Sequence, residues 1–192
     1  MNSCSKNCNN NSTNSTANSN QFVQSCPTIL ACTGAAAPVT ISNTTATAIT
    51  SSNPLTVSTL NINNSCLDNP CTIIDLFSSI SYTDTAAGTA TVTFQLYKIN
   101  LCSSTAPAIP VGSSWTYSST LTAAGTDTES YAFTSCDCNN SMCNCKCCSD
   151  GNECYSYVLR AIAATVPTTG SVTITNPTLK AISTCGNICC NR

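Results

Sequence analysis

The sequence contains no histidine and very little charge. Charged side chains make up 7% of the 192 residues, and the formal net charge is −2, whereas an ordinary soluble domain carries about 25% charged residues. Without histidine the chain lacks the commonest general base and the commonest metal ligand. The acidic residues form no spaced acidic motif. We therefore expect a protein that is not an enzyme and has no catalytic residues.

Basic clusters and long apolar runs are also absent. The small negative charge provides no basic patch for nucleic acid or for a membrane surface. No apolar run approaches the roughly 18 residues of a membrane-spanning helix. The first residues, MNSCSKNCN, are not followed by an apolar stretch of the signal-peptide type. We expect no nucleic-acid partner, no membrane span and no recognisable signal peptide.

A β-strand pattern runs through most of the chain. In Ala90–Ile99, apolar residues alternate with polar ones, which predicts a strand with one buried and one wet face. Further strands are predicted at 39–42, 45–50, 55–62, 72–82, 115–121, 130–135, 155–164, 172–176 and 179–184. Turns are expected at Asn-Pro pairs such as Asn176-Pro177, and a long loop at 100–114. Helix is poorly supported.

These strands predict an all-β fold, an antiparallel β-sandwich over residues 22–192. Eight or more strands in about 170 residues favour a jelly roll. A seven-stranded immunoglobulin-like sandwich is the competitor, but Trp115 lacks the flanking cysteines of the antibody pattern. Residues 1–21 are predicted to be a flexible N-terminal connector arm, because residues 9–20 are almost entirely Asn, Ser and Thr.

Seventeen cysteines are the most prominent feature of the sequence. In a chain of this size they indicate a disulfide framework or a thiolate–metal cluster. Because the count is odd, at least one thiol per chain is free or bonded to another chain. Cys26, Cys32, Cys66, Cys71 and Cys102 are scattered at predicted turns and strand ends, where intrachain disulfides usually lie.

Seven cysteines are concentrated in a Cys-rich insertion at about 136–154. Polar residues fill its gaps, so we expect a loop or hairpin rather than core. Adjacent Cβ atoms of an extended chain point to opposite faces, so Cys147 and Cys148, like Cys189 and Cys190, are candidates for disulfides between subunits. The remaining intrachain candidates are Cys136, Cys138, Cys143, Cys145, Cys154 and Cys185.

The same insertion also resembles a metal-thiolate cluster. Cys-x-Cys and Cys-Cys spacings next to Lys146 suit soft metals. They only loosely approximate the spacing of a zinc finger, and a metallothionein would lack the strand-forming body. We favour disulfides, with no metal site and no cofactor.

The layout of the chain resembles the subunits of bacterial endospore appendages, which are pilus-like fibres on spore surfaces. It shares an Asn/Ser/Thr-rich arm with cysteines, a β-sandwich body and a terminal cysteine pair. In that family a jelly-roll subunit extends an N-terminal connector whose cysteines bond to the cores of preceding subunits. The resemblance covers the layout rather than a specific motif, and the 136–154 cluster has no counterpart in it.

The resemblance implies specific roles for the terminal cysteines. Cys4 and Cys8 would be connector cysteines, and Cys189 and Cys190 would be candidate acceptors. The expected function is a self-assembling homopolymer, located outside the cell on the spore surface and cross-linked by disulfides. Two alternatives stay open. One is a metal-thiolate-binding coat or surface protein, and the other is an adhesive or carbohydrate-binding sandwich that uses the aromatic rings of its strands, although such rings more often pack in the core.

Overall fold

The computed structural model describes residues 28–34, 36–64, 67, 70–101, 107–138 and 154–185. Its elements follow one another along the chain in this order: β1 (Ile29–Cys32), β2 (Val39–Ser42), α1 (Asn43–Ala48), β3 (Leu55–Asn63), β4 (Pro70–Asp84), β5 (Gly88–Asn100), β6 (Ile109–Leu121), β7 (Gly125–Cys138), β8 (Cys154–Thr165) and β9 (Gly170–Cys185).

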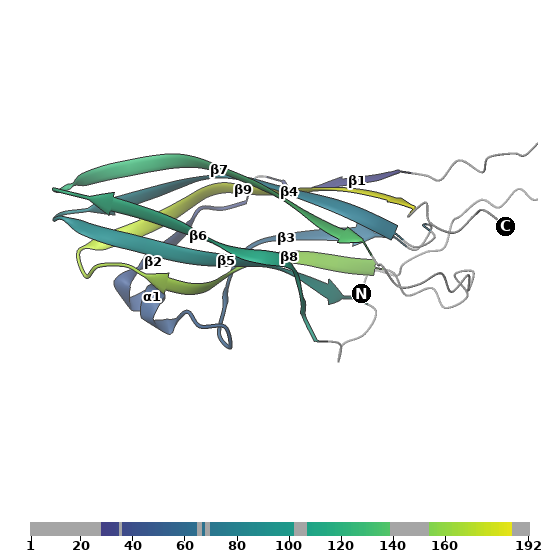
Figure 1. Cartoon of the computed structure of the whole chain (residues 1–192), viewed down its shortest axis with the longest axis horizontal. Helices are drawn as coiled ribbons and strands as arrows, with labels where there is room; N and C mark the ends of the chain where they lie inside the picture. Colours follow the sequence, from purple (N-terminus) through teal and green to yellow (C-terminus); the bar gives the residue numbers. More distant parts are fainter. Residues whose placement is uncertain are drawn as a thin grey trace, which may run out of the picture.

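Two antiparallel sheets are stacked as layers (Figure 1). The first has the order β1–β9–β4–β7, with β2 also paired to β9, and the second has the order β3–β8–β5–β6. If β1 and β2 are taken as one interrupted first strand, this is the strand order of a jelly roll. The prediction of an all-β, antiparallel sandwich with jelly-roll topology is confirmed. The predicted arm, residues 1–21, lies outside the described residues.

The core lies between the two sheets and follows the alternation of the strands. In β5, Ala90, Val92, Phe94 and Leu96 are all buried, as the period of two predicts. Tyr82, Tyr117 and Tyr157 are the largest fully buried side chains of the described residues. Tyrosines at these positions cannot form a binding platform on the surface, which weakens the carbohydrate-binding alternative.

The segment predicted as a strand at 45–50 instead forms the helix α1. Ser42 ends β2 in extended conformation, and its hydroxyl accepts a hydrogen bond from the backbone N–H of Thr45. This N-cap satisfies one of the free donors of the first turn. The helix also buries Ala46 in the core. Local capping and burial therefore override the strand propensity of the threonines.

The two strands predicted on either side of Asn176-Pro177 form the single strand β9. Asn176 has φ of 51°, and the register with β4 shifts between Phe77 and Ser79. This β-bulge accommodates Pro177, which has no N–H to donate. The carbonyl of Pro177 is still used, because it accepts the hydroxyl proton of Ser58 at 3.0 Å.

The loop predicted at 100–114 is shorter than expected, because β6 begins at Ile109. A register shift against β5 lies at Gly112, whose φ is +65°. The amide of Gln95 donates to the carbonyls of Val111 and Gly112 at 3.1 and 3.4 Å. This buried side chain thus gives hydrogen bonds to carbonyls at the irregular part of the ladder, where buried carbonyls need partners.

A buried carboxylate organises the end of the sandwich where β4 turns into β5. Asp84 is 2% exposed and accepts the hydroxyl protons of Thr169 and Tyr82, both at 2.6 Å, as well as the N–H of Ala86. The hydrogen bond from Thr169, followed by that from Tyr82, lowers the pKa of Asp84. Burial, followed by the neighbouring Asp84, raises the pKa of Tyr82 to about 12.

Acid should therefore weaken the fold through Asp84. The pKa of Asp84 is lower in the folded than in the unfolded chain, so the folded state binds fewer protons. The resulting stabilisation is present above the unfolded pKa of about 4. It is lost as the pH falls through the pKa of the folded state. Asp84→Asn cannot lose this contribution. We expect its thermal midpoint, followed by circular dichroism, to change less between pH 5 and 2 than that of the wild type. Parallel pH profiles of the two proteins would contradict this role.

Candidate functional site: the cysteine-bearing end of the sandwich

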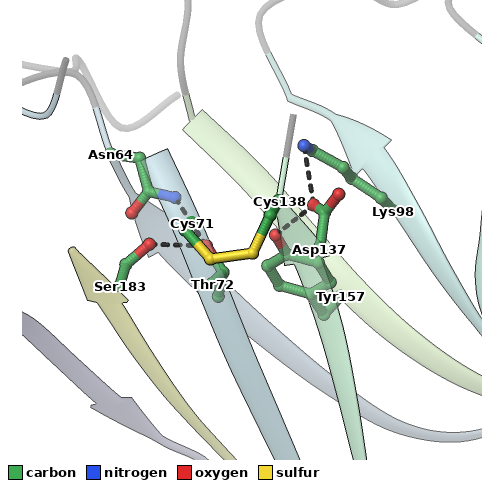
Figure 2. A network of polar contacts seen from close by, with 8 residues as sticks. All are labelled: Asn64, Cys71, Thr72, Lys98, Asp137, Cys138, Tyr157 and Ser183. Carbon is green, nitrogen blue, oxygen red and sulfur yellow. Dashed lines mark hydrogen bonds and ion pairs between the residues drawn. A yellow bond between two sulfur atoms is a disulfide. The ribbon is translucent and has the colours of Figure 1, made fainter. Parts of the chain in front are cut away.

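A disulfide joins Cys71 to Cys138 near the ends of two paired strands (Figure 2). The two residues face each other in the register of β4 and β7, with their Cα atoms 4.1 Å apart. They are 67 residues apart in sequence. Both were candidates for intrachain disulfides, and the ladder brings them together as direct cross-strand neighbours.

Buried hydroxyls lie beside this disulfide, on the side of β9. The hydroxyl groups of Thr72 and Ser183 are hydrogen-bonded to each other, and the amide of Asn64 donates to Thr72 at 3.2 Å. All three residues are at most 1% exposed. This network connects the end of β3 to β4 and β9. It gives the buried hydroxyls partners, while the side-chain oxygen of Asn64 has no hydrogen-bond partner among the described residues.

An ion pair lies on the other side of the disulfide and connects the two sheets. The Lys98 amine is 2.7 Å from Asp137, which also accepts the hydroxyl proton of Tyr157 at 2.7 Å (Figure 2). Burial, followed by the hydrogen bond to Asp137, raises the pKa of Tyr157 above its ordinary value. These groups hold one another in place, and the arrangement contains no nucleophile paired with a base.

The strand termini at this end of the molecule are close to one another. Registers place Pro70 opposite Cys185, Asn63 opposite Cys154 and Asn100 opposite Tyr155. We call the region of the strand termini Asn63, Pro70, Asn100, Cys138, Cys154 and Cys185 the cysteine-bearing end (Figure 1). Along the chain, segments 64–69, 101–108, 139–153 and 186–192 adjoin these strand termini.

The described cysteines differ in their bonding. Cys154 and Cys185 are disulfide-bonded, whereas Cys32 and Cys136 are free and exposed. We expected intrachain disulfides at Cys32 and Cys136. Free thiols are found instead because their register neighbours on the adjacent strand are Lys180 and Ile73, neither of which carries sulfur.

The predicted insertion at 136–154 is narrower in the structure. Cys136 and Cys138 belong to the end of β7, and Cys154 is the first residue of β8. Cys136 and Cys138 are strand residues because β7 continues to pair with β4 as far as Cys71. Cys154 is one because β8 pairs with β3 as far as Asn63. The other cysteines lie outside the described residues. They are the interchain candidates Cys4, Cys8, Cys147, Cys148, Cys189 and Cys190, and the intrachain candidates Cys26, Cys66, Cys102, Cys143 and Cys145.

Two shallow surface hollows meet at Cys136. One is lined by Trp115, Tyr131 and Phe133, and the other by Lys98 and Tyr155. Trp115 packs against Phe133 with ring centroids 3.7 Å apart. The free thiol of Cys136 is exposed where the two hollows meet.

Among the described residues, no three potential metal-ligating side chains come together, and no helix in these ranges is both long and apolar enough to cross a membrane.

The chain belongs to the family of the domain of unknown function DUF4489. The model of that family matches residues 26–184, which includes all the described strands except the last residue of β9, Cys185. A search of curated proteins finds no match.

Solved structures give weak similarity. A chain from the structure of infectious bursal disease virus, Gx strain, is 10% identical with a TM-score of 0.27, and one from the Gt strain is 11% identical with a TM-score of 0.22. Each match covers 82% of this DUF4489 chain, which spans only 40% and 36% of the respective viral chains.

Sequence reasoning missed the groups that surround the disulfide. Lys98, Asp137 and Tyr157 are far apart in the sequence and carry no shared motif. Only the pairing of β5 with β8 and the approach of β7 bring them together. No local signal marks these three residues. Ile73 and Ile182, which interrupt the polar face of otherwise alternating strands, concern the outer face of the sheet instead.

The Cys71–Cys138 disulfide should stabilise the fold, whereas the free thiols should not. Replacing both bonded cysteines by serine is expected to lower the free energy of unfolding by about 2–4 kcal/mol, since the bond closes a long loop in the unfolded chain. The matched control is the double variant Cys32→Ser and Cys136→Ser, which should unfold like the wild type. Urea denaturation without reductant measures both, on monomer separated from multimers by size-exclusion chromatography so that bonds between chains do not contribute. Equal loss in the two variants would contradict the assignment.

Proposed function

We propose that this DUF4489 chain is a structural subunit that self-assembles into a disulfide-cross-linked extracellular fibre, of the kind that forms appendages on bacterial endospores. The observation that carries the proposal is the pair of exposed free thiols on β1 and β7. Both strands are edges of the same sheet. The folded domain thus holds two free thiols at positions that another chain can reach.

The position of the N-terminal segment supports assembly between copies. Residues 1–27 precede β1, whose first residue pairs with Ser183 near the cysteine-bearing end. An extended segment of this length can reach about 90 Å, further than the domain to which it is attached. Cys4 and Cys8 could therefore reach a neighbouring subunit. Cys189 and Cys190, like Cys147 and Cys148, remain candidates for further bonds between chains.

Open sheet edges offer a non-covalent contact that could precede the covalent one. Among the described residues, β7 pairs only with β4, so the other edge of this 14-residue strand is unpaired. Unpaired strand edges bind other strands readily. A subunit that docks through an edge would hold its thiols near those of its neighbour, and the disulfides would then make the contact permanent.

The bonding of the described cysteines favours disulfides over a metal cluster. Within the 136–154 region, Cys138 is bonded to Cys71, and Cys154 is also disulfide-bonded. A bonded sulfur no longer supplies the thiolate that a soft metal requires. Metal analysis of protein purified without chelator tests the alternative, and several equivalents of zinc or copper per chain would favour it.

The purified protein should form multimers that survive heat and urea on non-reducing gels and that collapse to monomer when reductant is added. Electron microscopy with and without reductant should show the corresponding fibres. The variant Cys4→Ser and Cys8→Ser should lose the long multimers, whereas Thr13→Ser and Thr16→Ser, which alter the same segment without removing sulfur, should keep them. A wild-type protein that runs as monomer without reductant would refute the proposed function.

A further inference from the structure

The outer face of the β1–β9–β4–β7 sheet carries an unusual share of exposed apolar side chains. Six large hydrophobic residues are exposed among those described, and four of them lie on this face: Leu30 at 74%, Phe77 at 46%, Ile182 at 41% and Ile73 at 40%. Scattered single exposed residues need no explanation, but a contiguous group indicates a contact surface.

The strand registers make three of these residues neighbours. Leu30 faces Ile182, Ile182 faces Ile73, and Ile73 faces Cys136. Residues that face each other in paired strands project to the same side of the sheet, at a strand spacing of about 4.8 Å. Leu30, Ile182, Ile73 and Cys136 therefore form one apolar row across all four strands.

The other half of this face is different. Towards the far ends of β4 and β7, the outward positions hold threonine and serine, which pair as Ser81–Thr128 and Thr83–Thr126, each at 2.9 Å. Hydroxyls on the same two strands thus keep that half hydrated. The apolar side chains are confined to the half near the cysteine-bearing end.

The two free thiols lie at opposite edges of the apolar half. Cys136 ends the apolar row on β7, and Cys32 lies on β1, two residues after Leu30 on the same face. About three strand spacings, or roughly 14 Å, separate β1 from β7. Disulfides require Cα atoms within about 7 Å, so these thiols cannot bond to each other within one chain.

Opposite charges lie in the next row, at the centre of the face. Lys180 and Asp75 face each other in register, but no ion pair joins them, and within the described ranges Lys180 has no carboxylate partner. Its amine instead lies 5.3 Å from the centre of the Phe77 ring. Asp75 accepts the hydroxyl proton of Thr134 at 2.7 Å.

We propose that this half-face docks against the same half-face of a second copy. A two-fold axis in the plane of contact and roughly parallel to the strands exchanges β9 with β4 and β1 with β7 of the other copy. Ile182 then meets Ile73 of the second copy and Lys180 meets its Asp75. Cys32 lies in the Lys180 row and Cys136 in the Ile73 row, so an axis strictly parallel to the strands would leave Cys32 one row from Cys136 of the second copy. Aligned sheets cross at about 30°, and an axis tilted by half of that towards the diagonal between the two cysteines brings these edge residues nearly opposite each other. The face is complementary to itself in apolar surface, charge and sulfur.

The cross-link that follows needs an oxidant, which a low-molecular-weight disulfide supplies. The Cys32 thiolate attacks one sulfur of that disulfide and releases a thiol. The Cys136 thiolate of the other copy then attacks the mixed disulfide and releases a second thiol. Two protein thiols become one interchain disulfide, and the small disulfide is reduced to two thiols. This contact deepens the proposed function, on which it rests, by naming a lateral partner that does not use Cys4 or Cys8.

The test uses the full chain with Cys4→Ser and Cys8→Ser, incubated with oxidised glutathione. We expect a dimer by light scattering, and a Cys32–Cys136 peptide that joins heavy and light chains when isotope-labelled and unlabelled protein are mixed. Adding Ile73→Thr and Ile182→Thr should weaken dimerisation by about tenfold or more, because apolar contact is lost. Ile109→Thr, at a 58% exposed residue of the other sheet, is the matched control. Circular dichroism verifies that each variant is folded.

Three results would overturn the contact. These are a folded monomer under oxidising conditions, a dimer that the two isoleucine variants leave unchanged, or Cys136 bonded to a cysteine other than Cys32 of a second chain. The outcomes separate the two proposals. If the Cys4→Ser, Cys8→Ser variant dimerises but the wild type forms no fibre, this contact stands and the proposed function is refuted. If the wild type forms fibres but the variant stays monomeric, the proposed function stands and this contact is refuted.

Discussion

The pairing of β4 with β7 on one side and β9 on the other is the interaction on which the rest of the structure depends. It runs from Cys71 opposite Cys138 to Asp84 opposite Gly125. A slip of one residue would turn the buried face of β4 outward, so the apolar core fixes this register. The same register brings Cys71 to Cys138 and places Ile73 between Ile182 and Cys136.

The two ends of the sandwich are chemically different as a result. At one end, Asp84 is held by uncharged hydroxyls and a backbone N–H, and the nearby connections contain no cysteine. At the other end, a disulfide, an ion pair and buried hydroxyls lie together (Figure 2). Cross-links at one end leave the other half of the sandwich to fold by apolar burial. This division leaves the exposed thiols of Cys32 and Cys136 accessible while the core stays closed, as the proposed role of a cross-linked subunit requires.

Much of the fold could be predicted from side-chain alternation, because it reports directly on which face of a strand is buried. β5 shows this most clearly, with Ala90, Val92 and Phe94 all inside. Prediction failed where the backbone departs from regular pairing. The helix α1 depends on the cap at Ser42, and β9 continues through Pro177 only because a bulge opposite β4 absorbs it. Such adjustments depend on the neighbouring strand, which local sequence does not specify.

The sequence by itself determined the class of the protein, namely a β-sandwich of low charge, without histidine and rich in sulfur. Only the tertiary structure decided which sulfurs are paired. A disulfide requires two Cβ atoms within about 4.5 Å, and that distance is set by strand register rather than by spacing along the chain. Cys71 therefore bonds to Cys138 across 67 residues, while Cys136, two residues away, faces Ile73 and keeps its thiol.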